Sequence, residues 1–356
     1  MFARLSSWLI LLPGLVQPVS FTLQPERLPF TATDYTFTAV TDQRPARNNI
    51  GSWFVGPKQP AQPVDLADGA APALLEFIRQ NLRQKPGQRP VALRLAECKI
   101  TEKATGNRID GSFTFGVGFD LLKDADGEIT NKRLTEFKTG AKYTRPVGQT
   151  AVVESVVRQS LVGALTYFDQ YMKQAVKQDE RLARSLRVVF TNYAQNRDND
   201  TVFYDRTRPL TWADFKAKPR VGTRYAAEVN PNFGYEGRSR VVNGVIELNL
   251  VLKVYTLKSG SWATPPALNA YSLNHEQRHF DIAKIEAERF KRIIIPDSLS
   301  LEDYNSNVQF KFIESFRTMN LRQQQYDDET NHGIDQTAQE RWNQRIEGEL
   351  RAFSVK

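Results

Sequence analysis

The stretch Asn274-His275-Glu276-Gln277-Arg278-His279-Phe280-Asp281 decides how the second half of this chain folds. An α-helix turns by about 100° per residue, so residues four positions apart project from the same face. His275 and His279 can therefore direct two imidazoles at one metal ion, with Glu276 beside them. Two histidines at this spacing, with a glutamate after the first, are typical of zinc-dependent hydrolases, so we predict that Zn2+ binds here.

The flanking sequence predicts that this stretch is helical. Thr264 followed by Pro265 and Pro266 resembles an N-cap with proline in the first turn, and Pro296 marks the other end. Between them, apolar residues recur at helical spacing on the face that carries both histidines. We therefore expect a rigid helix whose metal-binding face is buried.

A catalytic zinc ion usually has three protein ligands and leaves a fourth position for water. The third histidine of the chain, His332, is the predicted third ligand, because Gly333 after it permits a tight backbone turn. Two alternatives remain open. His332 could cap the loop instead, and Glu314 could complete a site of two histidines and one glutamate.

Two further residues have predicted catalytic roles. Glu276 is the expected general base, which takes a proton from water and passes it to the leaving amine. Tyr326 ends an apolar stripe on the preceding helix, so it either packs in the core or hydrogen-bonds the developing oxyanion. The nearby carboxylates are expected to cap helices or to orient an imidazole through its other nitrogen, namely Asp281, Asp327 and Asp328.

A β-hairpin is predicted before the metal-binding helix. Asn243-Gly244 is a strong two-residue turn signal between residues 238–242 and 245–256, where apolar and polar residues alternate. One face of this hairpin should belong to the core. The same strands could also pair with an extended peptide substrate.

Residues 205–350 resemble a bacterial family of unknown function whose members are commonly described as zinc-dependent proteases. The resemblance implies a zincin-like metallopeptidase fold and implies no particular substrate. It rests on the following stretches: Leu210-Thr211-Trp212-Ala213-Asp214-Phe215, Tyr225-Ala226-Ala227, Ser261-Trp262, the Asn274 to Asp281 stretch above, and Tyr326-Asp327-Asp328-Glu329-Thr330-Asn331-His332-Gly333.

The length of 356 residues exceeds the size at which one hydrophobic core normally stops growing, so we predict two α+β domains. Residues 21–180 should form a smaller domain with a helix near 73–82, strands within 90–145 and a helix from 152 to 172. Residues 186–356 should form the zincin-like domain, with the break near 178–186. Cys98 is the only cysteine, which excludes an intrachain disulfide.

Residues 1–20 are predicted to be an export signal, because Arg4 precedes an apolar run that is short for a membrane span. The protein should therefore be periplasmic or extracellular, or else anchored by this segment if it is not cleaved. The net charge is +8, but the basic residues are dispersed among 40 acidic residues and form no cluster. This distribution argues against nucleic acid as a partner. A basic exported protein could instead associate with anionic envelope surfaces.

The sequence therefore predicts an exported zinc-dependent hydrolase of the peptidase kind, acting on a peptide or protein. The competing interpretation is a non-catalytic envelope binding protein whose metal is structural or absent. A fourth protein ligand would leave no position for water, so its presence would favour this binding protein. The sequence determines neither the cleavage specificity nor the oligomeric state.

Overall fold

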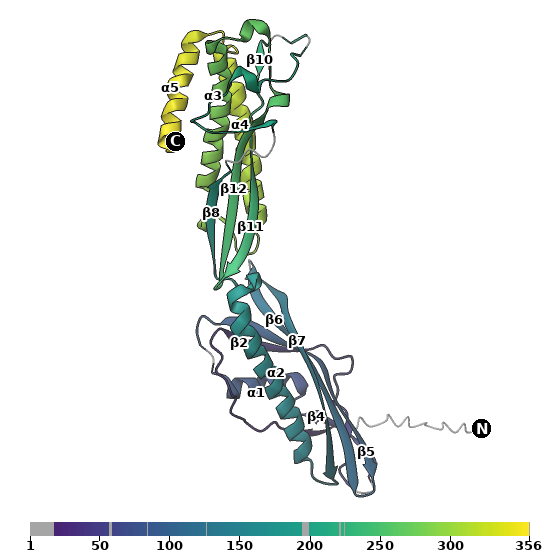
Figure 1. Cartoon of the computed structure of the whole chain (residues 1–356). Coiled ribbons are helices and arrows are strands. Elements are labelled where there is room, and N and C mark those ends of the chain that lie inside the picture. Colours follow the sequence, from purple (N-terminus) through teal and green to yellow (C-terminus); the bar gives the residue numbers. More distant parts are fainter. Residues whose placement is uncertain are drawn as a thin grey trace, which may run out of the picture. The chain divides into compact units, whose positions relative to one another are not determined.

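The computed structural model describes residues 18–355 except 57, 58, 84, 126, 194–198, 221 and 224. Most of the predicted export signal lies outside these residues. The chain has an α+β fold and divides into two compact units, Met1–Ala175 and Val176–Lys356 (Figure 1). The division falls in the last turns of a long helix, slightly before the break predicted at residues 178–186.

Unit 1 is built on a four-stranded sheet. The strands β5 (Arg89–Thr105), β6 (Arg108–Ala125) and β7 (Glu128–Pro146) form an antiparallel meander, and β2 (Tyr35–Asp42) pairs with β5 in parallel. These strands confirm the prediction for residues 90–145. A smaller sheet joins β1 (Val19–Phe21), β4 (Gln62–Leu66) and β3 (Ser52–Trp53).

Two helices complete unit 1, namely α1 (Ala70–Asn81) and α2 (Ala151–Gln178). Both match the predicted helices: α1 begins three residues earlier than predicted, and α2 continues six residues further. α2 packs on the sheet through Phe168, whose ring stacks on Phe119 with centroids 4.3 Å apart. Cys98 lies buried in this unit, and burial raises the pKa of its thiol to about 12, so the thiolate is suppressed at neutral pH.

Unit 2 contains the predicted hairpin. Strands β11 (Asn232–Val242) and β12 (Val245–Leu257) pair around Asn243 and Gly244, and both turn residues have positive φ angles, as a tight hairpin turn requires. β8 (Ser185–Asn192) adds to β12 in parallel, and β9 (Thr201–Phe203) pairs with the end of β12. β10 (Ala227–Glu228) and β13 (Trp262–Ala263) form a separate two-stranded sheet.

The long helix α3 (Ala270–Ile293) contributes to two cores in unit 2. Ala283, Ala287 and Phe290 pack with apolar residues of β12 and of α4 (Tyr304–Thr330). Ile282 and Ile285 instead pack with Trp342 and other residues of α5 (Gln336–Ala352). Because α3 is buried on two sides, its other side chains are held at fixed positions.

The predicted start of this helix was wrong. Residues Pro265–Ala267 form a separate 3-10 turn, and α3 begins at Ala270 with Asn269 as its N-cap. The Thr264 hydroxyl donates to the carbonyl oxygen of Ala226 at 2.9 Å, so it ties the chain to β10 and caps no helix. Within the described residues, no helix is long and apolar enough to cross a membrane.

Candidate metal centre

Helix α3 presents His275 and His279 on one face, as their spacing predicts. Their ring centroids lie 5.0 Å apart, and both residues are less than a tenth exposed. The Asn269 side chain accepts a hydrogen bond from the backbone N–H of Ser272 and so fixes the first turn of the helix. The pair therefore sits on a capped helix that is packed on two sides.

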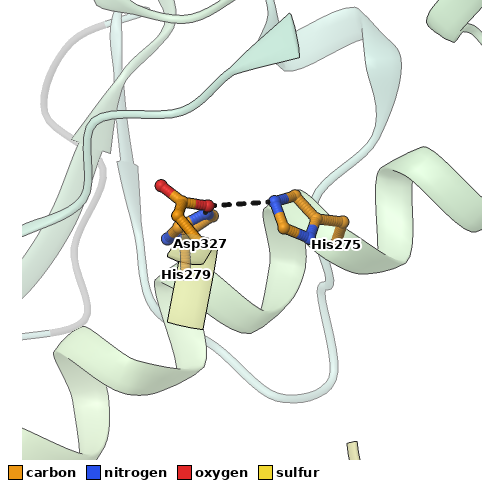
Figure 2. A group of neighbouring side chains, drawn as sticks. All are labelled: His275, His279 and Asp327. Carbon is orange, nitrogen blue, oxygen red and sulfur yellow. Dashed lines mark hydrogen bonds and ion pairs between the residues drawn. The ribbon is translucent and has the colours of Figure 1, made fainter. Parts of the chain in front are cut away.

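Asp327 of α4 directs its carboxylate at both imidazoles (Figure 2). Its Oδ1 lies 3.0 Å from His279 Nε2 and 3.3 Å from His275 Nε2. One ligand atom from each of these three residues lies within 4.8 Å of the other two, as one metal ion requires. Among the residues described by the structure, this is the group of histidine, cysteine and acidic side chains that could hold an ion.

The Nδ1 atom of each imidazole is hydrogen-bonded to the side chain of a glutamine. His275 Nδ1 lies 2.9 Å from Oε1 of Gln339, and His279 Nδ1 is hydrogen-bonded to Oε1 of Gln323. The amide orientations are fixed, because Nε2 of Gln339 donates to the Tyr326 hydroxyl and Nε2 of Gln323 donates to the His279 carbonyl oxygen. Each Nδ1 must therefore carry the hydrogen and donate it.

This tautomer leaves the Nε2 lone pairs of both histidines facing the carboxylate of Asp327. The two Nε2 lone pairs and the Asp327 carboxylate oxygen repel one another at this distance, so a proton or a cation between them would stabilise the group. Burial disfavours a charged His279, but the hydrogen bond and charge of Asp327 outweigh it and raise the pKa of this imidazole. Burial also opposes ionisation of Asp327, yet both histidines hold the pKa of its carboxyl below the usual range. A divalent cation would satisfy the same atoms.

Glu276 lies beside this group and is 5 % exposed. Its Oε2 accepts a hydrogen bond of 2.8 Å from the backbone N–H of Val229, just after β10. Burial raises the pKa of Glu276 despite the opposing effect of the two neighbouring histidines. A buried carboxylate with a raised pKa is suited to accepting a proton from water.

His275, His279, Asp327 and Glu276 line one hollow of about 630 Å³. Residues 225–232 form one wall, and Tyr271, Asn320 and residues 331–334 form much of the rest. The lining mixes aromatic, amide and charged side chains. A hollow of this volume lies within the usual range for ligand-binding pockets.

The predicted ligand His332 lines the same hollow but stands outside the converging group. Its Nδ1 lies 3.7 Å from Oδ1 of Asp327, and its ring lies 4.7 Å from the ring of Tyr225, centroid to centroid. The two imidazoles on α3 thus converge with a carboxylate from α4, whereas His332 lies next to that carboxylate. The sequence had assigned Asp327 a supporting role.

The structure does not bring the alternative ligand Glu314 to the site. Glu314 is exposed on α4, and 13 residues separate it from Asp327, which is about 20 Å along a helix. The Tyr326 hydroxyl is fully buried and lies 3.3 Å from the carbonyl oxygen of His275, to which it donates. The ring of Tyr326 stacks on the imidazole of His275 with centroids 4.8 Å apart, and Tyr326 is not among the residues that line the hollow, so the structure favours its packing role over the oxyanion role.

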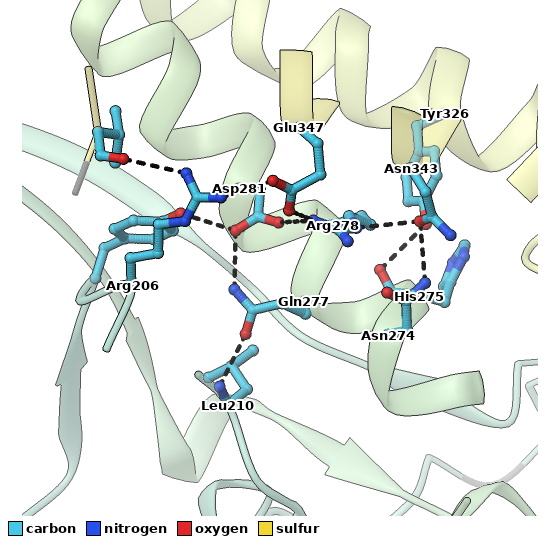
Figure 3. A network of polar contacts seen from close by, with 12 residues as sticks. Arg206, Leu210, Asn274, His275, Gln277, Arg278, Asp281, Tyr326, Asn343 and Glu347 are labelled. Carbon is cyan, nitrogen blue, oxygen red and sulfur yellow. Dashed lines mark hydrogen bonds and ion pairs between the residues drawn. The ribbon is translucent and has the colours of Figure 1, made fainter. Parts of the chain in front are cut away.

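A polar network that continues from His275 along α3 includes Gln277, Arg278 and Asp281 of the motif (Figure 3). Gln277 accepts from the backbone N–H of Leu210 and donates to Asp281. Arg278 donates to Asp281 and to Glu347 of α5. These bonds connect the Leu210 segment, α3 and α5, so they fix the helix that carries the histidines. Asp281 thus orients Arg278, and its carboxylate bonds Tyr204, Gln277 and Arg278 where an imidazole contact had been one expectation.

Two residues of the site, Gln323 and Gln339, had no predicted role, and Asp327 was predicted only to cap a helix or to orient an imidazole. A usable signal existed for the two residues of α4. The buried positions Met319, Arg322, Tyr326 and Thr330 continue at spacings of three and four, so the helix extends to Thr330. Gln323 and Asp327 flank this stripe and are four residues apart, as two neighbours on one helix face are.

Comparisons with known proteins assign no family to the chain. No family model matches it, and no curated protein matches it either. Among solved structures, a protein from Xanthomonas campestris, XCC0632, described as DUF330, has 13% sequence identity and a TM-score of 0.24. That match covers 43% of this chain and 94% of the other, and so low a TM-score carries no argument about fold or function.

Proposed function

We propose that residues 186–356 form a zincin-like, zinc-dependent hydrolase of the peptidase kind. The observation that carries the proposal is the convergence of His275, His279 and Asp327 within 4.8 Å, with both Nδ1 atoms already engaged by glutamines. Two imidazole nitrogens and one carboxylate oxygen are a usual ligand set for catalytic zinc. The donor set therefore fits the ion.

A zinc ion bound there would polarise a water molecule and a substrate carbonyl group. Glu276 would take a proton from the water as its oxygen adds to the carbonyl carbon. The same carboxyl would then give the proton to the amine nitrogen as the C–N bond breaks. The Val229 N–H holds Glu276 beside the hollow, so the base requires no large movement to reach the water.

The hollow supports a peptide or protein as the substrate. β10 and the residues after it form one wall, and extended backbone can pair with an extended peptide. Amide side chains at Asn230, Asn232 and Asn320 could hydrogen-bond a peptide backbone. Export to the envelope and association with its anionic surfaces remain proposals that rest on residues 1–20 and on the positive net charge.

The first experiment measures the zinc content of the purified protein by elemental mass spectrometry. We expect about one zinc ion per chain, strong loss of zinc in Asp327→Asn, and retention in the matched α4 variant Glu314→Gln. Wild-type protein that binds no zinc after zinc is supplied would exclude the metallohydrolase.

The second experiment separates catalysis from a structural metal. A pool of quenched fluorescent peptides is incubated with zinc-loaded wild type and with Glu276→Gln. We expect cleavage by the wild type and a loss of at least about 100-fold in the variant, with zinc retained, because general-base catalysis contributes that much. Zinc-loaded wild type that cleaves no peptide would favour the non-catalytic binding protein with a structural metal.

A further inference from the structure

The loop between α4 and α5 contains three consecutive residues in the left-handed region. The φ angles are 48° at Asn331, 54° at His332 and 79° at Gly333. Glycine adopts this conformation readily, and asparagine does so at the end of a helix, but a histidine there is uncommon. Unfavourable backbone conformations persist where the surrounding structure holds them, and they concentrate at functional sites.

Several contacts hold this loop in place. The His332 N–H donates to the Asp327 carbonyl oxygen at 2.8 Å, and the Tyr271 hydroxyl donates to the Gly333 carbonyl oxygen at 2.7 Å. Gly333 packs so closely on His275 that an added Cβ would lie 3.1 Å from Nδ1 of that ring. The backbone of His332 is therefore fixed relative to α3 and α4 by contacts on both sides.

This backbone places the His332 side chain in the wall of the hollow, next to the metal-binding group. The side chain is 25% exposed, and its Nδ1 lies 3.7 Å from Oδ1 of Asp327. The ring of Tyr225, which lines the same hollow, lies beside the imidazole with centroids 4.7 Å apart. The imidazole is thus held near the ion that the other residues would bind, and within reach of a substrate.

We infer that His332 does not bind the ion, because three other residues already supply enough ligands. His275, His279 and Asp327 already supply three ligand atoms, and a catalytic zinc keeps its fourth position for water. A fourth protein ligand would close the site. A histidine that stands beside an open metal site is instead placed to act on the substrate.

We propose that His332 donates a hydrogen bond to the substrate carbonyl oxygen as that oxygen becomes negatively charged. This inference rests on the proposed function. As the water oxygen bonds to the carbonyl carbon, the C=O π electrons move onto the carbonyl oxygen and Glu276 takes the water proton. The imidazole keeps its own N–H throughout and stabilises the charge by hydrogen bonding.

The test compares wild type with His332→Gly in the full-length, zinc-supplied protein. Glycine tolerates the left-handed backbone, so this variant removes the imidazole without adding strain. We expect zinc affinity within about threefold of wild type and kcat lowered by about 100- to 1,000-fold with KM little changed, as for loss of one oxyanion donor. Added imidazole should restore part of the activity of His332→Gly and should not raise that of wild type.

His279→Gly is the matched control, because it removes an imidazole from the predicted ligand set. If His332→Gly loses zinc as His279→Gly does, His332 is a ligand and the inference is wrong while the hydrolase stands. Unchanged kcat in zinc-loaded His332→Gly would also overturn the inference alone. Zinc-loaded wild type that cleaves no peptide would remove the hydrolase and the donor role together.

Discussion

At the scale of single residues, Gln339 shows how the protein sets the chemistry of an imidazole without touching the metal position. Its Oε1 accepts from His275, and its Nε2 donates to Tyr326 and to Asn343. The side chain is nearly fully buried, so it has little freedom to turn. It therefore fixes which nitrogen of His275 is available to a metal ion.

Replacement of Gln339 by leucine should weaken zinc binding by about 10- to 100-fold, which is usual for loss of a residue that orients a ligand. The His275 Nδ1–H would also remain buried without an acceptor. Titration against a competing chelator measures the affinity. Gln344→Leu is the control, because Gln344 is exposed on the same helix, and equal affinities in the two variants would contradict the assigned role.

At the scale of elements, the loop after α4 depends on a glycine for two separate reasons. Gly333 has a φ of 79°, and its Cα hydrogen faces the ring of His275. Gly222 has the same φ, but an added Cβ would meet no atom within 4 Å. Comparing substitutions at Gly333 and Gly222 therefore separates the effect of the positive φ from the effect of the contact with His275.

Gly333→Ala and Gly222→Ala should each lower the free energy of unfolding by about 1–3 kcal/mol, because alanine disfavours this φ. In Gly333→Ala alone, the Cβ should also displace His275 and lower zinc affinity. Chemical denaturation and chelator competition measure the two effects. Similar zinc affinities in both variants would show that the close packing on His275 has no role.

The short 3-10 helix Trp212–Asp214 is held by an acidic cap that should respond to pH. Asp214 accepts hydrogen bonds from Arg208 and from the Thr211 backbone. Burial opposes its ionisation, but these bonds outweigh it and lower the pKa of the carboxyl. Its stabilising contribution is therefore present above the unfolded-state pKa of about 4 and is lost as pH falls through the lower folded-state value.

Asp214→Asn should cost about 1 kcal/mol of unfolding free energy at pH 7, as is usual for a cap. The difference from wild type should shrink as the pH falls below about 4, since the wild-type carboxylate is then protonated. Urea denaturation at several pH values measures the difference in unfolding free energy between the variant and the wild type. Asp297→Asn, in an exposed 3-10 turn, is the control, and a difference that grows toward acid would refute the argument.

Much of unit 2 was predictable, because its signals are local. The Asn243-Gly244 turn and the two histidines four apart are each contained in a few residues, and the structure contains both. The position of Asp327 depends on how far α4 continues. No proline or glycine marks an end of that helix before Asp327, so its last residue was hard to predict. Gln339 meets His275 only because α5 packs on α3, which no local pattern specifies.

At the scale of the whole molecule, the two units carry different kinds of polar chemistry. The converging side chains of His275, His279 and Asp327, together with Glu276 and the two glutamines, all lie in unit 2. In unit 1, Glu102 and Arg145 form a fully buried ion pair of 2.7 Å. Tyr143 and the Phe54 backbone supply the remaining hydrogen bonds of this pair. The arrangement leaves neither charged group unsatisfied, so its role is to join strands.

Glu102→Gln should destabilise unit 1 by about 3–5 kcal/mol, because Arg145 would remain buried and charged without its partner. Zinc affinity should not change, since no ligand or support lies in that unit. Calorimetry and chelator competition measure the two quantities. Glu97→Gln on the same strand, whose partner Lys138 is mostly exposed, should cost at most about 1 kcal/mol. A matching loss of zinc in Glu102→Gln would show that the units depend on each other.

The position of Gln339 in α5 also governs when the centre can form during synthesis. A ribosome adds residues in order, at about 5–20 per second, so His275 and His279 emerge well before Asp327 and Gln339. A nascent chain that ends before α5 carries both histidines but lacks the partner that fixes His275. The growing polypeptide can therefore complete the proposed metal site only after the residues of α5 have been made and have packed on α3.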